Sequence, residues 1–287
     1  MTNASILITG ATGNVGSELV RQLSEKGIRY RVLVRPTDKP HSFPEGVEVI
    51  QGDLADEAGV HKALQGIEKA FLLTSSSEQA EQLQSTFVDI ARNAGVRHIV
   101  KLSQLHARSD SPVRFLRYHA AVEQKIKDSG MTYTFLRPNL YMQGLLGFRE
   151  LIVHRGKFYA AIGDAHISLV DIRDIAAVAA AALLDKEHEH RTYDITGPQS
   201  LSHKELAAIL STAIARPVQF EDVAPGQMLQ FLLAAGFPLW QAEGLIEDYA
   251  HYARGEAATV SSTVQDVTGR TARSFKQFAG DYAQAFS

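Results

Sequence analysis

One segment of the sequence carries side chains that exchange protons, but their spacing is unusual. The segment "RFLRYHAAVEQKI" contains Tyr118 and Lys125. A phenol and an ammonium four residues apart would share one helical face, about 6 Å from each other. Here the residue four after Tyr118 is Val122, and Lys125 lies seven residues on, about 10 Å along the axis. The sequence therefore predicts no lysine-assisted tyrosine.

The same segment does hold one polar pair at the four-residue spacing, His119 and Glu123. In one interpretation Glu123 orients the imidazole, and His119 fixes a cofactor or substrate. In the other, the two form a solvated helix pair worth a few tenths of a kcal/mol. The sequence leaves both interpretations open.

A glycine-rich turn near the N-terminus predicts a dinucleotide site. In "ILITGATGNVGSELVRQL", Gly10, Gly13 and Gly16 follow an expected strand and open an expected helix. Such glycines allow a tight turn, a close approach of backbone to pyrophosphate, and close helix–strand packing. The first amides of the helix then face the phosphates. The remaining residues of this predicted phosphate site are Thr12, Asn14 and Val15.

The end of the second expected strand indicates which dinucleotide is bound. NAD-binding folds place an acidic residue there to accept the ribose hydroxyls. This chain has Arg35 in "VLVRPTDK", and a guanidinium matches a 2′-phosphate instead. We therefore expect NADP(H) to be preferred over NAD(H), with a solvated arginine as the alternative.

The elements that must position these residues alternate between strand and helix. Strands are expected at 4–9, 29–34, 47–52, 69–74, 98–103, 132–137 and 191–196, with helices near 14–26, 57–65, 78–94, 113–129 and 172–184. This alternation is typical of an α/β, Rossmann-type doubly wound parallel sheet. We expect a cofactor-binding domain over 1–140, with segments from about 165–197 returning to it. Residues 141–287 are expected to form a smaller, mostly helical lobe that mainly covers substrate.

Composition excludes several classes of function. The 287 residues include no cysteine, so disulfides, thiolate metal sites and cysteine nucleophiles are ruled out. A net charge of −3 gives no footprint for nucleic acid, and no apolar stretch is long enough to span a membrane. His188 and His190 stand two apart in a charged run, which is more typical of a solvated loop than of a metal site. We expect a cytoplasmic monomer or homodimer without a metal.

A series of motifs resembles one known family. "TGATGNVG", "VKLSQL", "YHAAVEQKIKDSG", "YTFLRPNLYMQ" and "VDIRDIAAVAAAAL" occur in this order over roughly residues 4 to 215. Together they resemble the NmrA-like family of atypical short-chain dehydrogenases/reductases. That family contains reductases of quinones, triphenylmethane dyes and azo compounds. It also contains regulators that bind NAD(P)(H) without known turnover.

The resemblance implies roles for further residues. Asp53 and Leu54 would cradle adenine, although Asp53 is also a typical helix-start cap. Thr74 and Ser75 would line the path to the nicotinamide ribose. Ser103 stands where the wider superfamily has its serine, and it would bond a substrate oxygen or cap the strand end. The candidate catalytic residues are therefore His119, Ser103 and Tyr118.

The segment "LRPNLYMQG" follows the sixth expected strand. Pro138 directs the chain over the carboxyl end of that strand, where ligands bind in open α/β sheets. Pro138 is expected beside the cofactor, with Asn139, Tyr141 and Met142 in the substrate pocket. Alternatively, Tyr141 and Met142 form the core face of the next helix.

These features favour an NADPH-dependent reductase that transfers hydride to an electrophilic small molecule such as a quinone, an azo compound or a triphenylmethane dye. Such acceptors need little help from a protein acid, because the cofactor supplies the difficult step. An NADP(H)-binding redox sensor without turnover is the alternative. An isomerase or epimerase is disfavoured because its chemistry needs the missing tyrosine–lysine pair.

Overall fold

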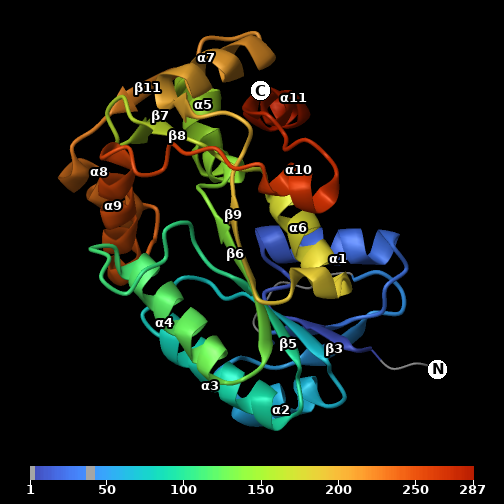
Figure 1. Cartoon of the computed structure of the whole chain (residues 1–287). Helices are drawn as coiled ribbons and strands as arrows, with labels where there is room; N and C mark the ends of the chain where they lie inside the picture. Colours follow the sequence, from blue (N-terminus) through green and yellow to red (C-terminus); the bar gives the residue numbers. More distant parts are fainter. Residues whose placement is uncertain (1–3, 37–42) are drawn as a thin grey trace. The chain divides into compact units, whose positions relative to one another are not determined.

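Seven short strands form one sheet in the computed structural model, which describes residues 4–36 and 43–287. The strands are β1 (Ile6–Ile8), β2 (Arg31–Val34), β3 (Glu48–Gln51), β4 (Lys69–Leu72), β5 (His98–Leu102), β6 (Thr132–Pro138) and β9 (Arg191–Ile195). They lie in the order β3-β2-β1-β4-β5-β6-β9 (Figure 1). Strands β3 to β6 of this order pair in parallel, so their carboxyl ends share one edge of the sheet.

Burial along the strands follows their position in the sheet. All residues of the central strands β1 and β5 are buried, as expected of parallel strands covered on both faces. The outer strand β3 is mostly exposed and carries Glu48, which suits an edge that must not pair with another chain. The register places Leu7 opposite Ala70 and Ile8 opposite Phe71, so β4 ends one residue beyond β1.

Helices cover both faces of the sheet. They are α1 (Asn14–Glu25), α2 (Glu57–Leu64), α3 (Ala80–Asn93), α4 (Arg114–Asp128) and α6 (Ile172–Leu184). Figure 1 shows α2, α3 and α4 on one face and α1 and α6 on the other. On the first face, Val60, Phe87 and Val122 pack with Ile99 and Phe135 of the strands in one core cluster. The doubly wound α/β fold expected from the sequence is confirmed.

The seven strands and five helices expected here are all present, with ends that differ by a few residues. Gly95 and Gly130 have φ angles of 84° and 80°, the left-handed conformation in which many helices end. In the described part of the chain, no helix combines the length and the hydrophobicity needed to cross a bilayer.

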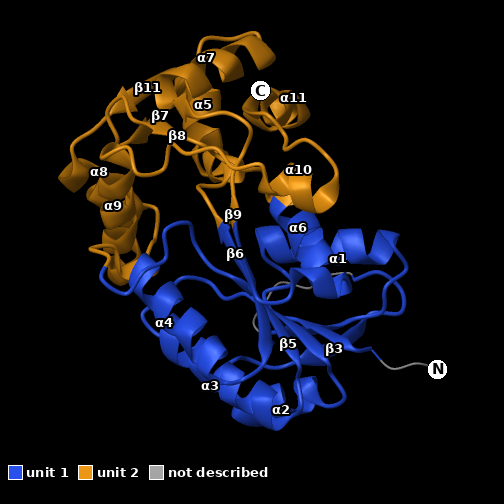
Figure 2. Cartoon of the chain, in the orientation of Figure 1, with its two compact units in different colours: residues 1–110, 116–137, 175–193 blue, residues 111–115, 138–174, 194–287 orange. Residues whose placement is uncertain are grey.

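Contacts divide the chain into two units (Figure 2). Unit 1 comprises Met1–Asp110, Leu116–Arg137 and Ile175–Tyr193. Unit 2 comprises Ser111–Phe115, Pro138–Asp174 and Asp194–Ser287. The chain leaves unit 1 after Asp110, after Arg137 near the end of β6, and after Tyr193 within β9.

Unit 2 is mostly helical and carries two small sheets. Its helices are α5 (Arg149–Arg155), α7 (His203–Ala213), α8 (Pro225–Ala234), α9 (Leu239–Ala253), α10 (Thr263–Thr268) and α11 (Phe275–Asp281), with the short 3₁₀ helix η1 (Met142–Phe148). Strand β7 (Lys157–Ala160) pairs in parallel with β11 (Gln219–Asp222), and β8 (His166–Ile167) pairs antiparallel with β10 (Leu201–Ser202). Its core includes Phe158, Phe275, Phe278 and Phe286, all almost fully buried.

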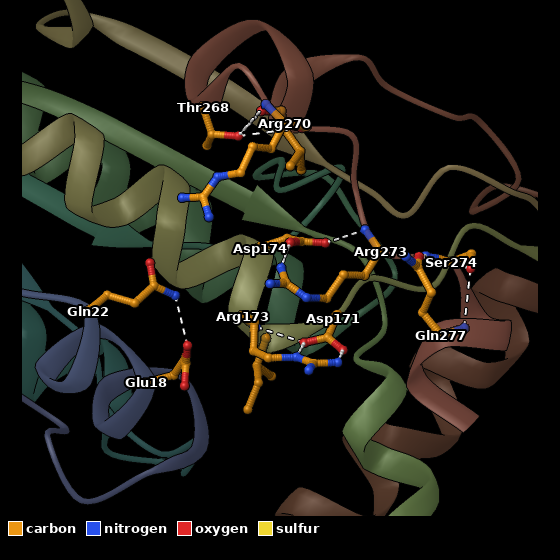
Figure 3. Close-up of polar contacts among 12 residues, drawn as sticks. Glu18, Gln22, Asp171, Arg173, Asp174, Thr268, Arg270, Arg273, Ser274 and Gln277 are labelled. Carbon is orange, nitrogen blue, oxygen red and sulfur yellow. Dashed lines mark hydrogen bonds and ion pairs between the residues drawn. The ribbon is translucent and has the colours of Figure 1, made fainter. Parts of the chain in front are cut away.

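The "VDIRD" motif serves unit 2 as a set of ion pairs (Figure 3). Asp171 is fully buried and accepts two hydrogen bonds from the Arg173 guanidinium, at 2.9 and 2.7 Å. Burial alone would raise the pKa of Asp171, but the bonds from Arg173 outweigh it and lower that pKa. Asp174 accepts from the backbone N–H of Arg273 at 2.6 Å and pairs with its guanidinium. These contacts tie the start of α6 to the segment before α11.

Candidate functional site

The strand order changes direction between β1 and β4, and this switch point is where open α/β sheets bind ligands. Thr9 joins the two strand ends there. Its hydroxyl donates to the Leu73 carbonyl at 2.9 Å, and the Leu73 N–H donates back to it at 2.8 Å. The loop that follows Thr9 is therefore anchored at its first residue.

The glycine loop has a geometry that only glycine permits at two positions. Gly10 has φ +65°, and a Cβ there would meet the Leu73 side chain at 2.8 Å. A Cβ on Gly16 would lie 2.0 Å from the Gly10 carbonyl oxygen, which is closer than any real contact. Helix α1 begins at Asn14 after the extended residue Gly13, and no side chain caps it. Its first amides are thus arranged to receive an anion, as a dinucleotide pyrophosphate requires.

The other predicted cofactor residues lie along the same edge of unit 1. Arg35 directly follows β2 and is exposed. The Asp53 carboxylate accepts from the Ala55 N–H at 2.9 Å in the turn before α2, whose N-cap is Asp56. Thr74 Oγ1 accepts from Gln84 Nε2 at 2.7 Å, which fixes the chain just after β4.

The neighbouring positions differ in exposure. Leu54 packs against the core cluster beneath α2, and Ser75 is exposed. Thr12 and Asn14 are accessible in the glycine loop, while Val15 is buried. The roles of all these residues toward a cofactor stay predictions.

The carboxyl end of β5 holds a buried lysine that contacts the candidate histidine. Lys101 is 0% exposed, and its Nζ donates to the Leu102 carbonyl at 3.1 Å. The same Nζ lies 2.9 Å from Nδ1 of His119, which is 8% exposed. Strand β5 and helix α4 therefore meet through an ammonium–imidazole contact.

Glu123 belongs to a different set of contacts. Its carboxylate accepts from Ser103 Oγ at 2.5 Å and from Arg137 Nε at 3.0 Å, and Arg137 Nη2 completes a bidentate pair at 2.5 Å. Glu123 is buried, with 2% exposure. Two parts of these interpretations are therefore wrong: the residues are not a solvated pair, and Lys101 rather than Glu123 holds the imidazole, while a contact of His119 with cofactor or substrate stays a prediction. The reason is that Arg137 and Ser103 offer the carboxylate stronger, charge-assisted bonds.

Burial sets the electrostatics of this cluster. It lowers the pKa of Lys101 to about 7, although the Glu123 carboxylate acts in the opposite direction. Burial, followed by the positive charges of Lys101 and Arg137, lowers the pKa of His119 well below its usual value. The imidazole is therefore neutral at neutral pH, while Lys101 exists in both protonation states.

Tyr118 and Lys125 point to different neighbours. The Tyr118 hydroxyl lies 3.2 Å from Ser76 Oγ, after the end of β4. Lys125 pairs with Asp89 of α3 at 2.7 Å, and Val122 packs in the core. The prediction that Lys125 does not assist the phenol is consistent with these contacts.

The sequence analysis did not identify Lys101 or Arg137 as candidate site residues. One signal was available: "HIVKLS" places a lysine among the apolar residues Ile99, Val100 and Leu102 of a strand whose residues are all buried. A charged residue there needs a partner or a shifted pKa. Arg137 gave no such signal, since arginine is common at strand ends.

The residues expected beside the nicotinamide and substrate belong to unit 2. Asn139 is buried, and its Nδ2 donates to Ser168 Oγ at 2.8 Å and to the Ala257 carbonyl at 2.9 Å. Met142 is 1% exposed and lies in the core cluster of unit 2, whereas Tyr141 is partly exposed and forms a bridge with Val170. Pro138 is the last residue of β6. Their proposed contacts with ligands stay predictions.

The two histidines in the charged run have structural contacts. His188 Nδ1 lies 2.8 Å from the Tyr193 hydroxyl, and the His190 ring meets the edge of Tyr133 at 5.1 Å. Across the described residues, no three His, Asp or Glu side chains gather as metal ligands.

Unit 1 thus combines a glycine loop at the start of α1 with a buried lysine–histidine contact at the carboxyl end of β5. Comparison with known proteins identifies the family. A model described as the NmrA-like family matches residues 2–279. The chain is 39% identical to an NAD(P)H azoreductase of Xenophilus azovorans, over 98% of this chain and 99% of that protein.

Two solved structures with bound cofactor share the fold over nearly their whole length. One is the NADPH-dependent quinone oxidoreductase QOR2 of Escherichia coli complexed with NADPH, with TM-score 0.83 and 27% identity, covering 96% of this chain and 99% of that one. The other is the Citrobacter sp. triphenylmethane reductase complexed with NADP(H), with TM-score 0.84 and 28% identity, covering 97% and 100%. The glycine loop, the motif order and these full-length matches agree, and the chain belongs to the NmrA-like family.

Proposed function

We propose that the chain is an NADPH-dependent reductase that transfers hydride to an electrophilic small molecule such as a quinone, an azo compound or a triphenylmethane dye. The support comes from the relatives that it matches over nearly their full length: an azoreductase, a quinone oxidoreductase and a triphenylmethane reductase. A nicotinamide cofactor is common to all three by name.

The observation that carries the proposal is the fit of the glycine loop to a dinucleotide. The space beside the Gly10 carbonyl accepts no side chain at Gly16, so the loop can close only with glycine there. The uncapped start of α1 adds the N–H groups that bind pyrophosphate. In this proposal Gly10 to Gly16 hold the pyrophosphate, Asp53 and Leu54 the adenine, and Thr74 and Ser75 the nicotinamide ribose.

A preference for NADPH over NADH is part of the proposal. Arg35 stands at the end of β2, where an acidic residue would be needed to accept the ribose hydroxyls of NAD. Its guanidinium offers two parallel N–H donors to a 2′-phosphate. Arg35 is exposed, so binding a phosphate there has a small desolvation cost.

The bound dihydronicotinamide supplies the hydride, and the chain's residues bind, orient and exclude water. Val122 stands at the helix position where a lysine would have to support Tyr118. This favours acceptors that are already electrophilic over simple ketones. We propose in addition that residues 141–287 mainly cover the substrate, and that the protein is a cytoplasmic monomer or homodimer.

The test is oxidation of NADPH by the purified protein with a panel of quinones, azo compounds and triphenylmethane dyes. Calorimetric titration with NADPH, NADP⁺ and NADH runs alongside. We expect NADPH to bind more tightly than NADH, and at least one acceptor class to give steady turnover. Tight NADPH binding without turnover on any acceptor would contradict the reductase and favour the redox sensor. The absence of dinucleotide binding would contradict both.

A further inference from the structure

The contact between Lys101 and His119 determines which nitrogen of the imidazole carries its proton. An ammonium has three N–H donors and no lone pair, so His119 Nδ1 must accept from Lys101 Nζ when the lysine is charged. A neutral imidazole that accepts at Nδ1 carries its hydrogen on Nε2. Lys101 therefore makes His119 a hydrogen-bond donor at Nε2.

The donor nitrogen is not committed elsewhere. Among the described residues, His119 Nε2 makes no hydrogen bond, and the residue as a whole is 8% exposed. The preceding residue, Tyr118, reaches Ser76 just after β4, and Lys101 bonds the Leu102 carbonyl at the end of β5. The pair thus lies at the carboxyl ends of β4 and β5, beside the switch point.

We propose that Lys101 is a positioning residue that fixes His119 as an Nε2–H donor and passes a proton through its ring to the anion that forms when the acceptor takes up hydride. This inference rests on the proposed reductase function, and it assigns the proton-donating step that the missing tyrosine–lysine pair leaves open.

The His119–Lys101 pair supplies the one proton that the acceptor needs. Hydride adds two electrons and one hydrogen to the acceptor, whose second heteroatom becomes an anion. The Nε2–H bond of His119 breaks as the new bond to this anion forms. An Nζ–H bond of Lys101 breaks as Nδ1 gains a hydrogen, so the imidazole stays neutral and Lys101 becomes an amine. Solvent returns one proton to the pair afterwards.

The surrounding charges suit this sequence of steps. Glu123 from α4 and Arg137 from β6 face the pair. They are paired with each other, and Glu123 also accepts a hydrogen bond from Ser103. Burial brings the pKa of Lys101 to about 7, so it can lose and regain a proton near neutral pH. The pKa of His119 is lowered by the same burial, which disfavours an imidazolium as a resting state.

Two acceptors differ in whether they need this proton. A cationic triphenylmethane dye becomes neutral when it accepts hydride, so no proton is required. A neutral azo compound becomes a strongly basic nitrogen anion, which must be protonated. The same enzyme and the same hydride donor can therefore be tested with and without a demand for a proton.

The experiment compares the wild type, Lys101→Met and Lys69→Met. Methionine has a similar length and removes the buried charge, while the Glu123 carboxylate keeps its bonds from Ser103 and Arg137. Lys69 is the matched control: it stands on the adjacent strand β4, and its Nζ donates to the Leu183 carbonyl at 2.6 Å. Burial lowers the pKa of Lys69 as well.

For Lys101→Met we expect kcat on the neutral azo compound to fall about 100-fold, the usual size of general acid catalysis. We expect kcat on the cationic dye to change less than about 3-fold, and Lys69→Met to resemble the wild type on both. Wild-type azo reduction should decline as pH rises above about 7, with no such decline for the dye. Equal losses on both acceptors would show a merely structural role and overturn the proposal.

A second readout needs neither cofactor nor turnover, nor does it depend on the folding of Lys101→Met. The ¹⁵N shifts of the wild-type imidazole, assigned by loss of the signal in His119→Gln, report the tautomer. We expect protonated Nε2 and unprotonated Nδ1 at pH 6; the reverse would overturn the inference. If the chain reduces no acceptor, the proposed function fails, and the tautomer still decides whether Lys101 positions His119.

Discussion

The two ends of β5 each place a buried histidine in a polar contact, and the contacts differ in kind. At the amino end, His98 Nδ1 lies 2.8 Å from Thr132 Oγ1 and Nε2 lies 3.2 Å from Thr134 Oγ1. At the carboxyl end, His119 of α4 meets the Lys101 ammonium through Nδ1 alone. The first ring is held at both nitrogens by neutral hydroxyls, whereas the second is held at one by a group that can lose a proton.

This difference separates the amino edge of the sheet from the carboxyl edge, where we propose that the cofactor binds. Both threonine hydroxyls beside His98 also lie near backbone carbonyls, that of Arg97 at 3.0 Å and that of His188 at 2.7 Å. A neutral imidazole has one N–H, so one hydroxyl donates to the ring and the other can donate to its carbonyl. The carboxyl edge instead keeps the uncapped start of α1 and one imidazole nitrogen for other partners. Parallel strands bring these groups to the same edge, because every carboxyl end points the same way.

The largest expected effect is a loss of NADPH affinity when the glycine loop at the carboxyl edge is changed. In Gly16→Ala the new Cβ would lie 2.0 Å from the Gly10 carbonyl oxygen, so the backbone must move. We expect NADPH affinity, measured by calorimetry, to fall by more than about 100-fold, since a displacement of about 1 Å has effects of that size.

The control for this loss is Gly27→Ala, at a residue with φ +67° and open space around its Cβ. Left-handed strain should lower the free energy of unfolding by about 1 kcal/mol and leave NADPH affinity unchanged. Wild-type affinity in Gly16→Ala would show that the loop does not hold the cofactor.

The next effect concerns His98 at the amino end of β5 and the pH dependence of the free energy of unfolding. Burial lowers the pKa of His98 to about 4, while the unfolded chain titrates near 6.5. The unfolded state therefore binds more protons between these values, and stability falls as pH drops from 6.5 to 4, by about 3 kcal/mol from this residue. In His98→Leu this part of the pH dependence should vanish from urea unfolding curves.

His203, whose pKa burial also lowers to about 4, is present in both proteins, so their difference isolates His98. We expect His98→Leu to keep the reductase activity of the wild type. An unchanged pH dependence of unfolding would show that the ring is not held neutral by its site.

A smaller effect tests whether Arg35, at the carboxyl edge, gives the protein its preference for NADPH over NADH. Arg35→Asp removes the donors proposed for the 2′-phosphate and places a carboxylate near it. We expect NADPH affinity to fall about 10- to 100-fold more than NADH affinity, the range of a lost charge-assisted bond. Equal losses for the two dinucleotides in calorimetric titrations would remove the basis for the preference.

The smallest effect concerns Lys125, two turns along α4 from Tyr118. Its pair with Asp89 is largely exposed, at 38% and 55% of the two side chains, so Lys125→Ala should change stability by less than about 0.5 kcal/mol. We expect kcat on every acceptor to stay at the wild-type level. A large loss of kcat would indicate that Lys125 supports proton transfer after all.

Much of the fold could be predicted from sequence, because its signals are local. A strand such as β1 is three buried residues in a row, and Gly10 follows it within two positions. The capping box of α7, formed by Ser202 and Glu205, is likewise contained in four residues. Patterns formed by residues close together in the chain can be recognised from the sequence alone.

The buried cluster could not be predicted in the same way. His119 and Glu123 have the spacing of a helix pair, and their spacing suggested that they bond each other. The structure gives each a partner from the sheet instead, Lys101 for one and Arg137 for the other. Those partners lie 18 and 14 residues away in the chain, and only the packing of α4 on β5 and β6 brings them within reach.

The sequence by itself thus determined the doubly wound sheet, the glycine loop and the absence of a lysine beside Tyr118, since each depends on residues close together in the chain. The tertiary structure decided which charges meet inside unit 1. A buried charge must find a partner or give up its proton, and which of these happens to Lys101 depends on the groups that folding places around it.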